Sequence, residues 1–310
     1  MTRPLLIAYL CWLAVPAAWC QKTEKYFDYQ WQETDALHAR FYSLIERTDS
    51  GWHRRDYFIH SLTLQMEGWY ADSACKVRSG KFRFVHPNRM VESAGLYQDG
   101  RKQGLWLTYY SDGSLADSTV YVNGAPVGVS LSWHRNGYMR DSANFGPDGS
   151  GVRVAWFDNG NPSYAGRFTA GFKKIGKWNY FHKTGGVSET ETYDTHGQLL
   201  DKLPDTSNTD AKAAFPGGPK AWSAYLSRAL YFPEQYTFTN GDEATVVIEA
   251  TIGEDGRVEE AEVAVPFYPA FDRIALNALL HSPRWTPAVD HHRKVRAVIR
   301  QPVTFSQPEQ

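Results

Sequence analysis

The stretch that decides the fold reads Gly104-Leu105-Trp106-Leu107-Thr108-Tyr109-Tyr110-Ser111-Asp112-Gly113. Its aromatic and β-branched residues favour a half-buried strand, and its Asp-Gly pair tolerates the positive φ angles of a tight hairpin turn. The run Trp133-His134-Arg135-Asn136-Gly137-Tyr138 has the same form, with Asn-Gly as the turn. Each stretch therefore predicts a β-hairpin.

This arrangement returns along the chain at a nearly constant interval. The copies start at glycines spaced 24, 24, 23 and 25 residues apart, namely Gly80, Gly104, Gly128, Gly151 and Gly176. An aromatic residue follows each start by seventeen positions: Tyr97, Tyr121, Phe145, Phe168 and Tyr193. A single hairpin is marginally stable alone, so the repeat predicts stacked hairpins that bury one shared aromatic face.

The composition agrees with a β-rich chain of more than one domain. Aromatic residues make up 15% of the 310 residues, and 25 glycines punctuate them. A chain of this length has room for about two domains. The formal net charge of −1 provides no overall field that would attract nucleic acid, so we expect no nucleic-acid partner.

The repeat resembles the bacterial form of the MORN repeat, whose units follow the pattern G-x-W-x-x-Y-x-x-x-G. The run from Gly104 to Gly113 fits this pattern, and so does the run from Gly176 to Gly185. The third and fourth units have Ser130 and Arg153 where the pattern has Trp, and are degenerate. With a looser early copy, the resemblance covers residues 57–198 and implies a scaffold or binding surface.

The aromatic residues of the repeats allow two interpretations. We expect them to form the core of the sheet, since strand alternation turns one aromatic inward and its neighbour outward. The alternative is a platform for carbohydrate or lipid. The candidates for an exposed stripe are Tyr110, His134, Phe157 and His182.

The first twenty residues have the form of a secretory signal. An apolar run over residues 5–15 is followed by Pro16, and Ala18-Trp19-Cys20 resembles a cleavage site. Cleavage there would release an exported chain that begins at Gln21 in the periplasm or envelope. The alternatives are lipidation of Cys20 and an uncleaved anchor in the inner membrane, although the run is shorter than the ~20 residues of a spanning helix.

Two less regular segments flank the repeats. Residues 21–56 are expected to cap the array, with an edge strand over residues 26–31 and a helical stretch over residues 36–47. Residues 199–214 have no apolar period and many turn formers, so they predict a linker.

Residues 215–307 predict a small α/β unit. Trp222, Tyr225 and Leu226 recur at helical spacing within residues 221–230, and a second helix is expected over residues 271–280. Alternating apolar residues predict strands over residues 244–252, 257–265 and 295–305. The first two strands are joined by a hairpin turn at Glu254-Asp255-Gly256.

This unit resembles the TonB C-terminal domain. The matching motifs include Phe215-Pro216-Gly217-Gly218, Gly253-Glu254-Asp255-Gly256-Arg257-Val258 and, above all, Pro283-Arg284-Trp285-Thr286-Pro287-Ala288. The residues of the structural signature are Trp222, Tyr225, Pro283, Trp285 and Pro287. One departure is His291-His292-Arg293, where the family usually has a polar Asn-Gly turn. The whole chain is thus expected to be a β-rich multidomain protein, with a hairpin array followed by a TonB-like α/β domain.

The resemblance implies partner recognition at an edge strand. In the family the domain captures a short peptide of an outer-membrane receptor, which adds to the sheet by backbone hydrogen bonding. The expected edge is the last strand, with the candidate contact residues Lys294, Val295, Arg296, Val298, Arg300 and Val303. Its basic residues allow two interpretations: they read acidic flanks of a partner, or they keep an open edge from self-pairing. The same edge leaves a homodimer open.

No catalytic, cofactor or metal motif accompanies these features. The sequence contains no C-x-x-C, H-E-x-x-H, phosphate-binding glycine loop or G-x-S-x-G. His291 and His292 are adjacent, so on a strand they would point to opposite faces. We therefore expect no enzyme and no bound cofactor or metal.

Three functional hypotheses remain. The first is a periplasmic TonB-like protein that recognises an outer-membrane receptor or another envelope protein by strand addition. The second is a TonB energy transducer held by an uncleaved N-terminal helix, which alone would engage inner-membrane motor proteins. The third is a scaffold that acts through the hairpin array.

Overall fold

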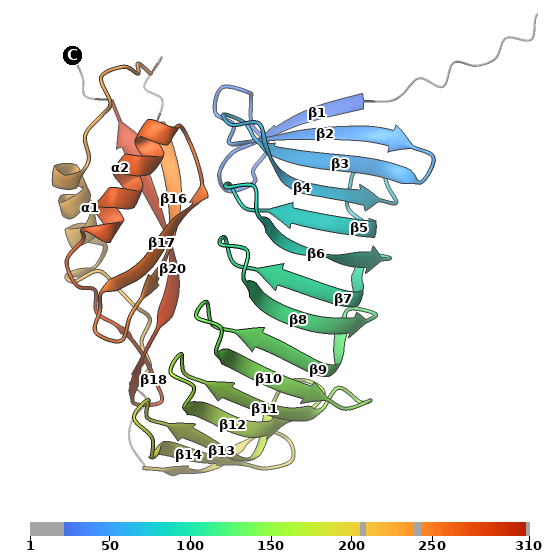
Figure 1. Ribbon diagram of the computed structural model, residues 1–310, viewed down its shortest axis with the longest axis vertical. Coiled ribbons are helices and arrows are strands. Elements are labelled where there is room, and N and C mark those ends of the chain that lie inside the picture. The colour runs from blue at the N-terminus through green and yellow to red at the C-terminus, as the bar shows by residue number, and fades with distance from the viewer. Residues whose placement is uncertain (1–21, 205–208, 239–242, 308–310) are drawn as a thin grey trace, which may run out of the picture.

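A computed structural model describes residues 22–204, 209–238 and 243–307. Fifteen strands form one antiparallel sheet in which every strand pairs with its neighbours in sequence (Figure 1). These strands are β1 (Lys22–Phe27), β2 (Phe41–Thr48), β3 (Gly51–Phe58), β4 (Thr63–Tyr70), β5 (Arg78–Val85), β6 (Val91–Gln98), β7 (Arg101–Tyr109), β8 (Leu115–Val122), β9 (Ala125–Trp133), β10 (Met139–Phe145), β11 (Gly151–Trp156), β12 (Pro162–Phe168), β13 (Lys174–Phe181), β14 (Val187–Tyr193) and β15 (Leu199–Leu203). The predicted stack of hairpins is confirmed, and we call this sheet the array.

The contact that joins successive hairpins is an aromatic ring lying on a glycine of the preceding strand. A Cβ atom added to Gly95 would meet the Trp106 ring at 2.3 Å, and one added to Gly166 would meet the Trp178 ring at 2.2 Å. Phe82 covers Gly68 in the same way. Only a residue without a side chain allows this close approach, so the Trp of the repeat and the glycine of the neighbouring strand form one packing unit.

The turn within each repeat hairpin differs from the expected two-residue type, which occurs instead between hairpins, as at Asn123-Gly124 with φ angles of 51° and 84°. At the Asn136-Gly137 pair only the glycine has a positive φ, 86°. The Gly137 N–H donates to the His134 carbonyl at 2.8 Å, and the His134 N–H donates to the Tyr138 carbonyl at 2.8 Å. The turn is thus four residues long and ends in a bulge with its glycine in the left-handed region. The prediction of a hairpin was right, but two left-handed residues are not needed.

The expected exposed stripe is largely absent. The Tyr110 hydroxyl donates to the Trp133 carbonyl at 2.8 Å, and Nε2 of His134 lies 2.9 Å from the Trp156 carbonyl oxygen. Phe157 is buried, and only His182 of the four candidates is exposed. The Tyr110 and His134 side chains reach along the array to the next hairpin, because consecutive turns stack at the same edge.

The N-terminal cap is part of the same sheet. β1 is the predicted edge strand, shifted towards the N-terminus, but the helix expected over residues 36–47 is wrong. β2 occupies this segment, and Phe41, Ser43 and Ile45 are buried in alternation. This period of two matches a strand that pairs with β3, and the sheet continues across residue 56. At the other end, β15 forms from the first residues of the expected linker.

The terminal unit has the predicted elements. Helices α1 (Gly218–Ala229) and α2 (Pro269–Leu280) cover one face of a three-stranded antiparallel sheet in the order β17-β16-β20. Its strands are β16 (Glu243–Ile252), β17 (Val258–Val265) and β20 (Ala297–Ser306), and a short ribbon consists of β18 (Ala288–Asp290) and β19 (Arg293–Val295). The core between helices and sheet includes Ile248, Phe271 and Leu279.

The other face of this sheet points towards the array (Figure 1). Val247 and Val265 pack against Phe41 and Phe58 of the array in one buried cluster. Beside this cluster, the Arg40 guanidinium lies 4.2 Å from the centroid of the Phe267 ring. Apolar packing of this kind holds the terminal unit against the N-terminal part of the array.

The ring-on-glycine contact yields a prediction about stability. We expect Gly166→Ala to lower the free energy of unfolding by about 1–3 kcal/mol, because its methyl group would overlap the Trp178 ring. Gly171→Ala is the matched control, since its nearest neighbour would be Thr169 Oγ1 at 3.9 Å. Equal denaturant midpoints for the two variants would contradict the role given to the contact.

Candidate functional site

The candidate recognition site is the free edge of β20. β20 pairs with β16 over ten residues, from Ala297 opposite Ile252 to Ser306 opposite Glu243. Among the described residues no second strand pairs with β20, so one row of its backbone groups lacks a strand partner. A row of unpaired N–H and C=O groups is a template for an added strand.

The last strand is shorter than expected. Residues 293–295 belong to β19, which pairs with β18, and the backbone leaves strand geometry at Arg296. Lys294 and Val295 therefore lie on the ribbon and not on the β20 edge. The strand expected over residues 295–305 was wrong at its start, because Val295 pairs with Ala288 of β18 and the pairing with β16 begins only at Ala297.

The candidate side chains on β20 point to different faces. Val298 is 65% exposed, and Arg300 is also exposed. Val303 has no exposed surface, because it faces the helices in the core of the terminal unit. Its side chain cannot touch a partner, so alternation along the strand leaves Val298 and Arg300 as the contact residues of this set.

Pro302 shows which backbone groups face the open edge. It lies opposite Val247 in the ladder and has no N–H to donate. In an antiparallel pair, every second residue bonds to the partner strand, and the others direct their backbone groups away from it. Val298, Arg300 and Thr304 lie an even number of residues from Pro302. Their N–H groups therefore also point to the free edge.

The basic residues of the predicted site have partners within the protein. Arg296 lies 2.5 Å from Glu259, 3.3 Å from Asp158 and 3.7 Å from Glu260. Arg300 lies 3.5 Å from Glu249. Arg296 thus joins the terminal unit to the array, and this contact favours neither of the two roles expected for it.

The signature residues build the core that supports this edge. The Trp222 and Trp285 rings lie 5.6 Å apart, and both contact Phe215. The Tyr225 hydroxyl donates to the Ala278 carbonyl at 2.8 Å. Pro283 and Pro287 flank Trp285 in the segment that leads from α2 to β18. These residues therefore act on structure and do not lie at the edge.

The β18–β19 ribbon anchors the terminal unit to the last strands of the array. His291 and His292 form its turn, with positive φ angles of 49° and 60° where the family has Asn-Gly. The His291 ring stacks on Tyr180 at 3.5 Å, and His292 lies 3.2 Å from Glu189. Side chains other than Gly and Asn rarely adopt this conformation, and contacts with the array hold it here.

Arg293 completes the anchor. Its side chain is buried and donates to the backbone carbonyls of Ser163 and Phe181, at 2.6 and 3.0 Å. It also pairs with Asp290 at 2.7 Å. The three residues that depart from the family pattern, His291-His292-Arg293, thus contact the array. Sequence reasoning missed this role because their partners lie more than a hundred residues away in the chain.

The charges around this turn balance one another. Glu189, Glu191 and His291 bring ligand-type atoms within 4.8 Å of one another. Lys202 pairs with Glu189 at 3.2 Å, and Lys174 pairs with Glu191 at 2.8 Å. With a lysine on each carboxylate, the cluster has the chemistry of an ion-pair network. Burial alone would lower the pKa of His291, but its bonds to Asp290 and Glu191 outweigh burial and raise that pKa to about 9.

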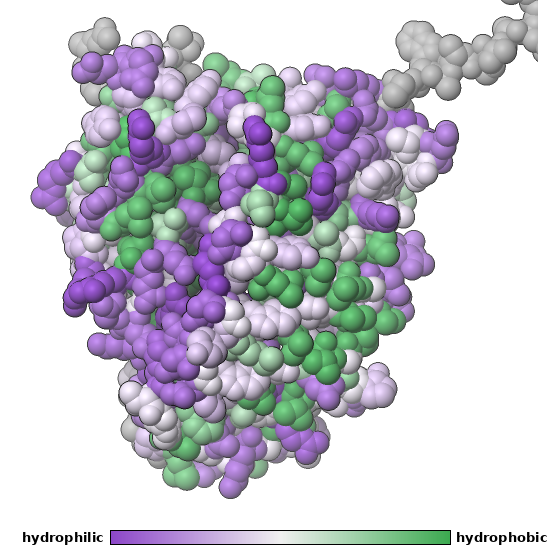
Figure 2. Space-filling model, in the orientation of Figure 1, coloured by the Kyte–Doolittle hydropathy of each residue, from purple (hydrophilic) through white to green (hydrophobic). Residues whose placement is uncertain are grey.

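A groove runs between the terminal sheet and the array, and Val298 of β20 lies at its border. A cavity of about 300 Å³ is lined by Val298 and Glu249 of the terminal sheet and by His86, Tyr110 and Arg140 of the array. The surface is hollowed along this seam, and hydrophilic side chains gather beside the hollow (Figure 2). The array is thus a second wall of the candidate site, which no local sequence pattern indicated.

The terminal unit matches a known family. Residues 229–306 match the family model described as the Gram-negative bacterial TonB protein C-terminal. This is a domain of transport and interaction and not of catalysis, and proteins of the family work in the bacterial envelope. The match confirms the predicted TonB-like domain and relates the chain to TonB-dependent transport.

The other comparisons add limits. The family model does not extend over the array, whose likeness to MORN repeats stays a resemblance. No curated protein matches the chain significantly. In the described part of the chain, no helix has the length and apolar character needed to span a membrane.

The raised pKa of His291 predicts a pH-dependent anchor. Because the folded pKa of about 9 exceeds the unfolded value near 6.5, protonation favours the folded state. This stabilisation is complete below about pH 6.5 and is lost as the pH rises through about 9, at a cost on the order of 1–3 kcal/mol. Thermal unfolding measured from pH 6.5 to 9.5 would report the loss.

His291→Asn removes the titrating group and keeps a residue that tolerates positive φ. We expect this variant to lose most of the pH dependence over that range. His196→Asn is the control, since the His196 side chain is 89% exposed. A wild-type-like pH profile in His291→Asn would show that another group is responsible.

Proposed function

We propose that this protein is exported to the periplasm and recognises an outer-membrane receptor, or another envelope protein, by adding a partner segment to β20. The observation that carries the proposal is the ten-residue β20 strand, which pairs on one side alone among the described residues. The TonB-type family match supports it, because that family supplies the transport context.

The chemistry of the edge suits strand addition. Backbone N–H and C=O groups along Val298, Arg300 and Thr304 would give affinity that does not depend on partner sequence. Selectivity would come from the side chains of the added strand that turn towards the groove. There they would meet Val298 and Glu249 on one wall and the array on the other.

The array has a defined part in this proposal. Arg135 of the array lies 3.2 Å from Glu260 and 3.5 Å from Glu262 of β17, and Arg293 is buried at the far end of the junction. Together with the apolar cluster around Phe41, these contacts fix the distance between β20 and the array. We propose a division into a repeat region, over residues 57–198, and a TonB-like domain, over residues 215–307, that share one binding groove.

Arg300→Pro tests strand addition. The substitution removes an N–H that points to the free edge and leaves the ladder with β16 intact. We expect the affinity for peptides from the periplasmic N-terminal segments of outer-membrane receptors to fall about tenfold, the cost of a lost hydrogen bond. Fluorescence anisotropy with such labelled peptides is the measurement.

Arg300→Ala is the matched control, because it removes the same side chain and keeps the N–H. Equal binding by the two variants would show that backbone pairing at this edge is not used. If none of the peptides binds the wild-type protein, receptor recognition by this edge is wrong.

Export is tested by the intact mass of the protein from fractionated cells. We expect a soluble periplasmic species that begins at Gln21, as the apolar run and the Ala18-Trp19-Cys20 site indicate. A full-length species in the inner membrane would instead support the energy-transducer hypothesis, in which the N-terminal segment is retained.

A further inference from the structure

The row of ring-on-glycine contacts is interrupted in the middle of the array. Cross-strand pairing places eight residues in one row on one face, in the order Gly95, Trp106, Thr119, Ser130, Ala143, Arg153, Gly166 and Trp178. At both ends a ring covers a glycine. In the middle, Ser130 and Arg153 replace the ring, and Thr119 and Ala143 replace the glycine.

Both members of each packing unit have therefore changed together. Thr119 and Ser130 join their hydroxyl groups at 2.6 Å, where a ring and a glycine would otherwise meet. Removing the ring alone would leave an apolar hole, which destabilises a core. Here polar groups line the interruption instead. The polar lining is therefore a consistent feature of the third and fourth repeats and not an apolar packing defect.

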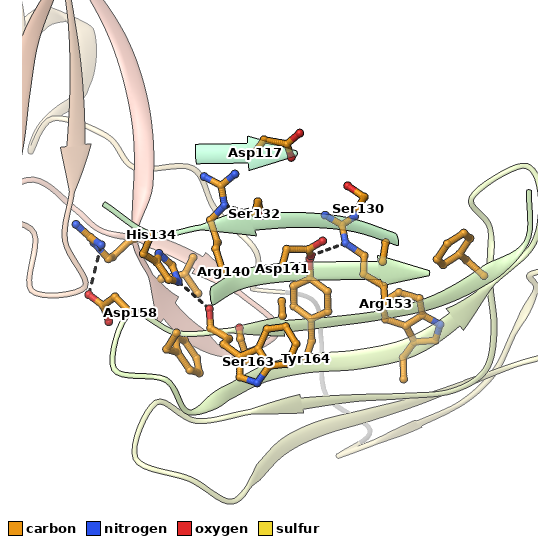
Figure 3. A pocket seen from close by; sticks show the side chains of 18 of the residues that line it. Asp117, Ser130, Ser132, His134, Arg140, Asp141, Arg153, Asp158, Ser163 and Tyr164 are labelled. Carbon is orange, nitrogen blue, oxygen red and sulfur yellow. Dashed lines mark hydrogen bonds and ion pairs between the residues drawn. The ribbon is translucent and has the colours of Figure 1, made fainter. Parts of the chain in front are cut away.

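A cavity of about 470 Å³ opens at this interruption. Ser130, Ala143 and Arg153 of the interrupted row line it, and the terminal unit contributes Glu254 and Arg296 at its border. Its volume lies in the range of about 300–1,000 Å³ that is usual for small-molecule sites. Figure 3 shows polar side chains from β8 to β12 converging on this space.

A second row beside the first supplies charged groups. Asp117 and Asp141 both pair with Ser132 in the ladders, so they share its face. Arg140 donates to the Ser132 hydroxyl and the Tyr110 hydroxyl, both at 3.3 Å. Within the described residues, neither Arg140 nor Asp117 forms an ion pair, although both line the cavity.

The other two charged groups hold each other in place. Asp141 accepts a hydrogen bond from Arg153 Nε at 2.6 Å and one from the Tyr164 hydroxyl at 3.3 Å (Figure 3). A carboxylate can accept further bonds and a guanidinium has five N–H donors. The pair therefore keeps hydrogen-bonding capacity for a ligand while it fixes the orientation of both groups.

The charged groups and aromatic rings that line the cavity indicate which class of ligand it can bind. The two carboxylates and two guanidinium groups of the central rows carry no net charge, so they favour neither an anion nor a cation. They do offer alternating acceptors and donors at close spacing. Beside them stand the rings of Phe145, Phe172 and Trp178, and Phe172 is 61% exposed.

We propose that this cavity binds a saccharide of roughly one or two pyranose rings, in the size range of such pockets. Sugar hydroxyl groups both donate and accept, which matches the alternating Asp117, Arg140, Asp141 and Arg153 groups. The apolar face of a sugar ring would pack on the exposed Phe172 ring, since the Trp178 ring is buried against Gly166. An apolar ligand would displace water from Asp117 and Arg140, which form no ion pair in the described part of the chain, and would offer them no hydrogen bond in return, at a cost that opposes its binding.

The test is isothermal titration calorimetry of the full protein with cellobiose, maltose and N,N′-diacetylchitobiose. We expect at least one of them to bind with a dissociation constant of about 1 mM or tighter. Inorganic phosphate and spermidine serve as anionic and cationic probes of matched concentration, and we expect neither to bind in the cavity.

The double variant Thr119→Gly with Ser130→Trp refills the interruption in the manner of the other repeats. We expect it to abolish saccharide binding and to leave the thermal midpoint unchanged or higher, since it restores a ring-on-glycine contact. Asp141→Asn should weaken binding about tenfold through one charge-assisted hydrogen bond, and it stays informative if the double variant fails to fold. Arg83→Gln, at a half-exposed side chain elsewhere on the array, is the control and should bind as wild type.

Three results would overturn the proposal. These are binding of no saccharide at 10 mM, equal saccharide binding by a folded double variant, or binding of phosphate or spermidine that the double variant abolishes. Peptide binding at β20 is measured separately, so failure here leaves the proposed recognition function standing.

Discussion

An aromatic ring resting on a glycine of the preceding strand is the contact on which the array depends. In a sheet with one strand after another, each hairpin contacts mainly the hairpins before and after it, so it must bury apolar surface against these neighbours. Trp106 on Gly95 and Trp178 on Gly166 do this, and each ring also donates its indole N–H to a backbone carbonyl at 2.9 and 2.7 Å. The requirement explains why the repeat has both a Trp and a glycine.

The second constraint is that the helices of the terminal unit cover only one face of its sheet. Helices α1 and α2 cover one side, and the array covers the other, so the two units complete each other. The contacts combine a small apolar cluster around Phe41 with ion pairs of Arg135 and Arg296. Exposed ion pairs are individually weak, but here they lie along a seam that also holds the buried Arg293. The seam determines which side chains of β20 remain available: Val298 faces the groove, and Arg296 is engaged.

The interruption of the ring contacts is a departure from the local packing rule of the array. A chain that only needed a stable sheet would continue the ring-on-glycine pattern through every repeat. Departures from a local rule without an evident structural gain tend to mark functional sites. Ser130 and Arg153 depart together with Thr119 and Ala143, and charged groups from the adjacent row fill the edge of the space. The degenerate repeats thus have a coherent physical explanation.

The sequence by itself determined the hairpin array, its interval and the elements of the terminal unit, because these depend on turn chemistry and on alternation within a few neighbouring residues. It also identified Ser130 and Arg153 as exceptions, but not what they line. Local patterns failed at residues 36–47, where a mixed composition hid a strand, and at Val303, whose burial depends on the helices above it. Only the tertiary structure decided that Arg296 pairs with Asp158, that His291 stacks on Tyr180 and that a polar cavity opens between two rows. These outcomes depend on side chains more than a hundred residues apart or on the pairing of six strands, and no local spacing contains that information.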